Sequence, residues 1–562
     1  AEDTQSDAEA VGALSEVIPP SGPRHALTFY SVAACREGAP PPGVFTKSAA
    51  ALGIDFVHEP NVVDEEGMLV MDFGGVGIAD LDGDKFLDLY FTNAGGPDRV
   101  FLTQGRGPAA FRGYTPGVPQ SQNLVVSLAD LDGDGDVDAL VARDEAGWLE
   151  NDGSGQFVAF RPIAPGIVAA EHTVFGFTTG DLNSDGWLDV LTSVHEVVPT
   201  DDDREWPGAE WLHTGSPVGL VDATASVPNR AVEDWTFLTA LSDFDSDGDL
   251  DLYEFNDAFS LAVQGLSQDD FTRQGNRVVE NRNGTLVDRT DDSSGAIIRT
   301  AMGGATGDYD NDGLIDVYVT TMRPETNALL HNDGDFQFTD VAFDLDADTL
   351  DDSHDVGWGA VFFDADSDGW LDLFVAHGFL TDFDHDIGPV NAAQQSDVLL
   401  RNSGMAGQTH AGFRNISEQA AITGPGWSRS PSVGDLNRDG FVDLVVGTAN
   451  GPPAVYLNGC DDRPQLTIRL VGSGPNSAGI GARVTVSTAS KTQVREIQGG
   501  GSGLYGSSAP EATFGFATGT KSVDLSIRWP AGGTSSWNGI EVGYVIEARP
   551  TTAIEPPSST EM

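Results

Sequence analysis

Seven short loops carry the residues of this chain that are best suited to chemistry. The first has aspartates at positions 1, 3, 5 and 9 of the nine residues from Asp80 to Asp88. The same spacing starts again at Asp130, Asp181, Asp243, Asp308, Asp364 and Asp435. Side-chain oxygens at these positions, with the backbone carbonyl of position 7, suit a hard cation that takes six to eight oxygen ligands. The pattern therefore predicts about seven Ca²⁺ sites.

The candidate ligands are the same five positions in each loop. They are Asp80, Asp82, Asp84, Phe86 and Asp88; Asp130, Asp132, Asp134, Asp136 and Asp138; Asp181, Asn183, Asp185, Trp187 and Asp189; Asp243, Asp245, Asp247, Asp249 and Asp251; Asp308, Asp310, Asp312, Leu314 and Asp316; Asp364, Asp366, Asp368, Trp370 and Asp372; and Asp435, Asn437, Asp439, Phe441 and Asp443. The amides at position 3 of loops three and seven remove one charge, so these two loops are expected to bind more weakly.

Position 6 is glycine in every loop except the first, where Lys85 takes its place. Glycine reaches positive φ without a steric cost, so loop one is expected to be the most distorted or the weakest. An EF-hand is a poor alternative, because position 12 lacks a carboxylate in six loops and the flanks are rich in Val, Phe and Thr. A second alternative is that the aspartates only form solvated turns. A turn does not require four carboxylates that repel one another, so it does not explain why the pattern occurs seven times.

The elements that position these loops are short strands. One apolar strand enters each loop, a second leaves it, and two more precede the next copy 50 to 71 residues later. Four short strands per repeat, seven times over, predict a seven-bladed β-propeller. We expect an all-β fold with a tail over 1–42, the propeller over 43–462, a small β-sandwich over 463–549 and a second tail over 550–562.

The composition of the chain limits the classes of binding partner and the cellular compartment that we expect. The net charge of −58 would still be −44 with seven bound calcium ions, which argues against nucleic acid and anionic membranes. The sequence contains no run of about 18 apolar residues, which is the length needed to span a bilayer. Cys35 and Cys460 flank the repeats and predict a disulfide formed in an oxidising compartment. The first residues, Ala-Glu-Asp, resemble a mature end after signal cleavage, so a secreted, periplasmic or cell-surface protein is expected.

Long connections between the second and third strands are expected on the face opposite the calcium loops, where function often resides. These connections carry His195, Trp206, His377, Asp382, Asp384, His385 and Asp386, the last four of which could hold another metal. No Gly-x-Ser-x-Gly, His-Glu-x-x-His or Cys-x-x-Cys-His motif is present, so no catalytic residue is assigned. We expect binding of an extracellular protein or glycan, with a propeller enzyme or a self-assembling surface protein as alternatives.

Two groups of motifs resemble known modules. The Gly-Val…Asp-x-Asp-x-Asp-Gly-x-x-Asp units, above all 357–375, resemble the FG-GAP (VCBS) repeats of integrin-α-like propellers. Gly479–Val484, Gly499–Gly501 and Arg528–Pro530 resemble the ASPIC/UnbV domain. Their order is similar to that of the cartilage acidic protein 1 family, without its EGF-like module. The resemblance implies a secreted calcium-binding protein, often linked to adhesion, and no mechanism.

Overall fold

The computed structural model describes residues 14–551 with internal gaps at 21, 23, 36–37, 60–73, 106–110, 119–122, 143–144, 164–171, 197–209, 229–235, 259–274, 323–324, 351–355, 379–382, 385–387, 390–394, 407–408, 423, 425 and 501–502. Within these residues the fold is all-β, as expected, with two short 3₁₀ helices, η1 (Ala50–Leu52) and η2 (Thr224–Ser226). Among the helices of this part, none has the length and apolarity to cross a membrane.

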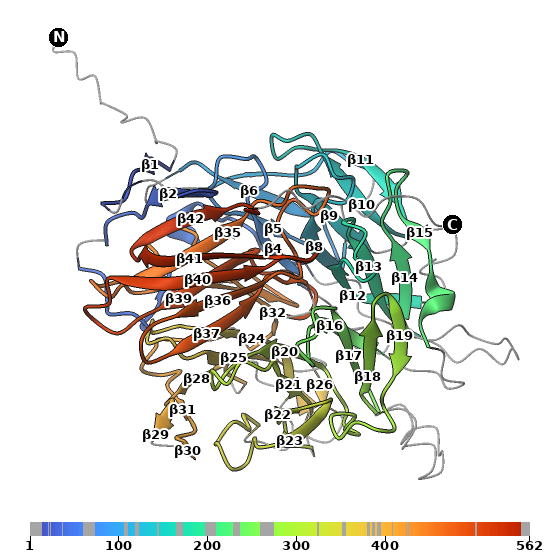
Figure 1. Ribbon diagram of the computed structural model, residues 1–562. Helices are drawn as coiled ribbons and strands as arrows, with labels where there is room; N and C mark the ends of the chain where they lie inside the picture. The colour runs from blue at the N-terminus through green and yellow to red at the C-terminus, as the bar shows by residue number, and fades with distance from the viewer. Residues whose placement is uncertain are drawn as a thin grey trace, which may run out of the picture.

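Seven antiparallel sheets, here numbered I to VII, follow one another along the chain (Figure 1). Sheet I is β4 (Val76–Ala79), β5 (Asp88–Phe91), β6 (Arg99–Thr103) and β7 (Phe111–Tyr114); II is β8 (Val125–Ala129), β9 (Asp138–Ala142), β10 (Ala146–Asn151) and β11 (Phe157–Pro162); III is β12 (His172–Gly180), β13 (Asp189–Glu196), β14 (Glu210–Thr214) and β15 (Val221–Asp222); IV is β16 (Thr236–Ser242), β17 (Asp251–Asn256), β18 (Arg277–Arg282) and β19 (Thr285–Asp288). Sheet V is β20 (Gly303–Gly307), β21 (Asp316–Thr320), β22 (Ala328–Gly334) and β23 (Gln337–Asp340); VI is β24 (Gly357–Phe363), β25 (Asp372–His377), β28 (Val398–Asn402) and β31 (Phe413–Asn415); VII is β32 (Ser428–Gly434), β33 (Asp443–Thr448), β34 (Ala454–Leu457) and β3 (Thr46–Lys47).

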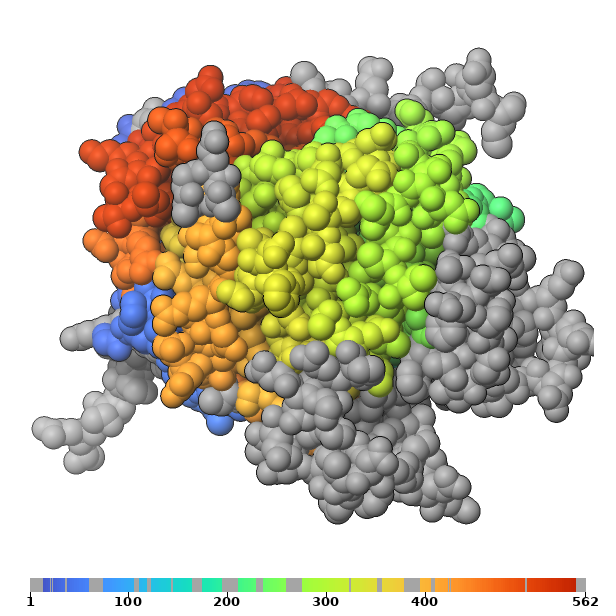
Figure 2. Space-filling view, turned by 90° about the horizontal axis from the view of Figure 1, so that it is seen from below, coloured from blue at the N-terminus to red at the C-terminus, as the bar shows by residue number. Residues whose placement is uncertain are grey.

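Each aspartate loop joins the first and second strands of a sheet. The first strands β4, β8, β12, β16, β20, β24 and β32 contact one another in this order, and β32 contacts β4 again. Apolar side chains of neighbouring sheets pack together, as Ile78 and Leu89 of sheet I do with Val445 and Val455 of sheet VII. Sheets IV to VI, green to orange, lie side by side in Figure 2. Two small hairpins, β26 (Phe383–Asp384) with β27 (Gly388–Pro389) and β29 (Met405–Ala406) with β30 (Thr409–His410), complete this region.

The last of these sheets takes its outer strand from the beginning of the chain. Thr46 and Lys47 of β3 pair with Leu457 and Tyr456 of β34. Nearby, Cys35 and Cys460 form the predicted disulfide, with their Cα atoms 5.6 Å apart. Strand pairing and a covalent bond therefore join the two ends of the repeat region.

Two further sheets lie beyond the repeats. One is formed by β1 (Glu16–Val17), β2 (Leu27–Ser31), β42 (Tyr544–Ala548), β35 (Gln465–Leu470) and β39 (Glu511–Gly515); the other by β37 (Thr492–Glu496), β36 (Arg483–Ser487), β40 (Ser522–Arg528) and β41 (Thr534–Glu541). Ile468, Ile546, Val484 and Ile527, two from each sheet, share one apolar core. The N-terminal segment expected as a tail thus contributes β1 and β2 to this region, and β2 lies beside β42 in Figure 1.

A segment of this C-terminal region reaches between the first strands of the repeats. Strand β38 (Gly499–Gly500) pairs with β12, and the Val126 N–H donates to the Tyr505 carbonyl at 3.1 Å. The Gly503 N–H donates to the Ala360 carbonyl at 3.0 Å. A Cβ atom on Gly75 would lie 2.4 Å from the Tyr505 carbonyl oxygen, which explains a glycine there. Residues 498–500 and 503–509 therefore lie against the first strands of several repeats.

Candidate metal centres

Each aspartate loop is held by one repeated set of backbone hydrogen bonds. The aspartate at position 9 accepts the position 2 N–H on one oxygen, at 2.8–3.2 Å. Its other oxygen accepts an N–H at or just after the end of the third strand, at 2.7–3.0 Å. Position 1 accepts the position 6 N–H, and position 5 accepts the position 7 N–H. These bonds curl the loop around its own carboxylates.

The backbone turns through positive φ at two positions of every loop, not one. Position 6 does so in all seven, including Lys85 at φ 75°. Position 4 does so as well, at Gly83, Gly133, Ser184, Ser246, Asn311, Ser367 and Arg438. Loop one keeps the position 6 bond, because the Lys85 N–H donates to Asp80 at 2.9 Å. The lysine therefore leaves the hydrogen bonding of the loop intact, at the cost of a conformation that side chains disfavour.

The loops bring carboxylates close enough together to share one cation. In loops one, two, four and five, one oxygen from each of positions 1, 3 and 9 lies within 4.8 Å of the others. In loop five the position 5 aspartate, Asp312, also comes within 4.8 Å of Asp310 and His331. The Asp80 Oδ1 and Asp366 Oδ1 atoms are buried and have no hydrogen-bond partner. Buried oxygens without partners are costly, and a divalent cation would satisfy them, so the residues fit calcium.

Burial makes the carboxylates of these loops hard to ionise without a cation. It raises the pKa of Asp138 and of Asp316 to about 8, and the carboxylates beside them add to the rise. Burial likewise raises the pKa of Asp308 and of Asp364 to about 7. A divalent cation would favour the ionised forms, because an opposite charge stabilises a buried carboxylate.

Cationic side chains of the C-terminal region contact several of the loops. Arg469 donates to Asp80 of loop one at 2.9 Å, and Arg528 donates to Asp243 of loop four. Lys491 donates to the Asp368 carbonyl of loop six at 3.3 Å. Glu511 takes part by pairing at 2.6 Å with the buried Arg438 of loop seven. The C-terminal sheets thus lie against the loop side of the repeats and offset part of its negative charge.

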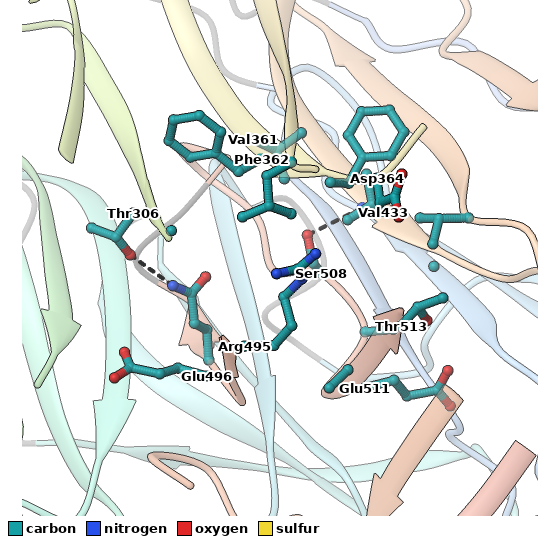
Figure 3. A pocket seen from close by; sticks show the side chains of 18 of the residues that line it. Thr306, Val361, Phe362, Asp364, Val433, Arg495, Glu496, Ser508, Glu511 and Thr513 are labelled. Carbon is teal, nitrogen blue, oxygen red and sulfur yellow. Dashed lines mark hydrogen bonds between the residues drawn. The ribbon is translucent and has the colours of Figure 1, made fainter. Parts of the chain in front are cut away.

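A cavity of about 120 Å³ with a mixed polar and apolar lining lies at this contact (Figure 3). Asp308, Asp364 and Asp435, the first aspartates of loops five to seven, line it from the repeats. The side chain of Arg495 points into it from the C-terminal region, as Figure 3 shows. Burial lowers the pKa of Arg495, and Asp364 and Asp308 oppose this effect. The cavity therefore belongs to the junction between the loops and the C-terminal sheets.

Five asparagines at the end of the third strands also build the site, and sequence inspection missed this role. Each side-chain amide donates to the position 8 carbonyl of its own loop and to the position 2 carbonyl of the preceding loop. They are Asn151, Asn281, Asn332, Asn402 and Asn458. Asn151 and Asn332 had the sequence context of ordinary turns. A recurrent Asn 13 to 30 residues after position 9 is the signal that could have revealed them.

Substitution N402A is expected to destabilise the protein by about 2–3 kcal/mol, because it leaves the buried carbonyls of Tyr309 and Leu371 without this donor. Chemical denaturation followed by tryptophan fluorescence measures the change. The matched control is N415A, whose exposed side chain bonds only to Ser417. Equal stabilities of the two variants would contradict the role assigned to Asn402.

The residues that we expected on a ligand-binding face differ in where the structure places them. His377 ends β25 and is 3% exposed; its ring nitrogens lie 3.0 Å from Thr349 Oγ1 and 2.9 Å from the Ser396 carbonyl. It is a packed residue and not a loop residue, which corrects that expectation. His195 lies in β13 and Asp384 in β26, but their side chains are outside the described structure. Trp206, Asp382, His385 and Asp386 lie outside the described residues.

Comparison with known families agrees with the repeated geometry. The FG-GAP-like repeat profile matches residues 80–141, 130–192 and 308–375, and the FG-GAP repeat profile matches residues 428–460. The ASPIC and UnbV profile matches residues 472–555. The chain carries FG-GAP repeats followed by an ASPIC/UnbV domain. No curated protein sequence matches it.

The solved structures that match this FG-GAP and ASPIC/UnbV chain are distant from it. One is a lectin from Agrocybe aegerita that recognises non-reducing terminal N-acetylglucosamine, at 15% identity over 68% of this chain and 90% of that chain, with a TM-score of 0.36. Another is a mutant of AofleA from Arthrobotrys oligospora, at 12% identity over 62% and 88%, with a TM-score of 0.34. Likenesses this low carry no argument about what the chain binds.

Proposed function

We propose that this chain is a secreted, calcium-binding protein that acts as an extracellular binding, adhesion or scaffold module. Its repeats form a closed seven-bladed propeller, and its last two sheets form a small β-sandwich. The observation that carries the proposal is the recurrence of one loop in which buried carboxylates converge and some oxygens lack any partner. Bound calcium would neutralise these carboxylates and fix each loop.

The strand contacts support a closed ring. The first strands touch in one cycle, and β3 from the N-terminal segment completes sheet VII. The two C-terminal sheets share a core, as the layers of a sandwich do. The order of the two family matches further supports a relative of the cartilage acidic protein 1 family.

The disulfide and the charge support an extracellular setting. Disulfides persist in oxidising compartments, and calcium sites of modest affinity suit the millimolar calcium found outside cells. A surface that stays at −44 after loading with seven ions disfavours nucleic acid and anionic membranes as partners.

The placement of the C-terminal sheets supports a proposal for the face that a partner would use. They cover the loop side through Arg469, Arg528 and Lys491, and residues 498–500 and 503–509 contact the first strands. An extracellular protein or glycan would then bind on the opposite face, where the longest connections between strands emerge.

Metal content and partner binding test the proposal together. After dialysis against millimolar Ca²⁺, elemental analysis is expected to find about seven calcium ions per chain, one for each loop. Glycan and matrix-protein arrays are then probed in calcium and in EDTA, with binding expected in calcium. Elemental analysis that finds no calcium would overturn the proposal. Equal partner binding in calcium and in EDTA would show that partner binding does not depend on the metal.

A further inference from the structure

One position beside five of the seven loops differs in chemistry from sheet to sheet. It immediately precedes the inter-sheet asparagine, and it is Glu150 in sheet II, Glu280 in IV, His331 in V, Arg401 in VI and Leu457 in VII. Arg401 reaches into loop six, where its Nε lies 2.6 Å from Asp366 and its Nη2 lies 3.2 Å from Asp368. Side chains at this position therefore reach the carboxylates at positions 3 and 5.

Loop five places an imidazole nitrogen among its carboxylates in the same way. His331 Nδ1 lies 3.5 Å from Asp310 Oδ2 and 3.3 Å from Asp316 Oδ1. One ligand atom each from His331, Asp310 and Asp312 lies within 4.8 Å of the other two. Ligands of one tetrahedral zinc ion, bound at about 2.0–2.1 Å, stand about 3.4 Å apart. The 3.5 Å between His331 Nδ1 and Asp310 Oδ2 is close to this value.

Two polar atoms around this loop, Asn311 Oδ1 and His410 Nε2, are buried and have no hydrogen-bond partner among the described residues. The rings of His331 and His410 both contact Tyr309, with ring centroids 6.4 and 5.1 Å from it. Buried polar atoms without partners are uncommon and point to a missing ligand or ion.

We propose that loop five prefers a transition metal, with His331 Nδ1, Asp310 and Asp312 as ligands of Zn²⁺ or a similar first-row dication, and takes Ca²⁺ when no such ion is supplied. Imidazole suits such ions, whereas calcium takes oxygen ligands. The inference rests on the proposed function only in requiring that the loops bind divalent cations. The imidazole before the asparagine thus favours zinc at loop five, whereas loops without an imidazole offer oxygen ligands only.

Zinc binding in the presence of calcium tests this site. The full chain is dialysed against micromolar Zn²⁺ and millimolar Ca²⁺, and elemental analysis is expected to find one zinc per chain. Substitution H331Q is expected to weaken zinc binding at least tenfold. Loss of a residue that only hydrogen-bonds to a metal ligand already lowers metal affinity by this factor, and loss of a ligand should cost more. H25Q, at an exposed histidine elsewhere, is the matched control and should bind zinc like the parent.

A transplant makes the test independent of any folding defect in H331Q. Glu150 precedes Asn151 as His331 precedes Asn332, and its charge acts on Asp132 of loop two. Substitution E150H should raise the zinc content from one to two per chain. If calcium binds but the parent takes up no zinc, or H331Q leaves zinc affinity unchanged, this inference fails while the proposed function stands. If neither metal binds, the proposed function itself fails.

Discussion

Removal of calcium with EDTA is expected to lower the melting temperature by more than any single substitution in the loops. A ligand that binds only the folded state adds about 2.7 kcal/mol at a concentration one hundred times its Kd, and seven loops contribute separately. The effect should be large because the position 9 carboxylates are almost fully buried, at 0–1% exposure. Differential scanning calorimetry in calcium and in EDTA measures it.

The pH dependence provides the control for this experiment. Burial raises the pKa of Asp138 and Asp316 to about 8, above the usual value of about 3.9 in an unfolded chain. In that interval the folded state holds more protons, so stability in EDTA should fall as the pH rises from about 4 to about 8. Calcium should remove this decline. Melting curves that coincide with and without EDTA at pH 8 would refute the role given to the ion.

Reduction of the Cys35–Cys460 disulfide is expected to have the second largest effect. The bond closes a loop of 425 residues, and in the chain-entropy model it stabilises by on the order of 5 kcal/mol. It also holds the segment that carries β3 beside sheet VII. Thermal unfolding of the double variant C35S/C460S and of the reduced parent measures the loss.

The two Cys samples control each other. C35S/C460S and the reduced parent should melt at the same temperature, below that of the oxidised parent, since the chain has no third cysteine that could form another disulfide. Substitution S48P, which removes the backbone donor to the Val455 carbonyl beside β3, should lower stability by less than loss of the disulfide. Identical melting of oxidised and reduced protein would show that strand pairing alone joins the ends.

The aspartate loops and the cysteine pair could be predicted because their evidence is local in sequence. A nine-residue spacing repeated seven times identifies the loops, and two cysteines leave one possible pairing within the chain. The positive φ at position 4 was hidden, because Gly83, Asn311 and Arg438 share no residue type. The geometry of a turn can be conserved across a set of side chains that differ.

The remaining features depend on contacts between distant segments. Asn402 bonds to Tyr309, 93 residues away, and Arg469 bonds to Asp80, 389 residues away. No local sequence pattern predicts a contact between residues so far apart in the chain. The same is true of His331, whose closeness to Asp310 and Asp312 arises only when β22 folds back beside loop five.

The segment that contacts the first strands has a consequence for biosynthesis. Tyr505 and Gly503 bond to strands β8 and β24, yet they are made after all seven repeats. During synthesis on the ribosome, the inner edges of the early repeats must therefore wait for nearly the whole polypeptide to emerge. A nascent chain halted before residue 498 would expose this lining to chaperones and proteases.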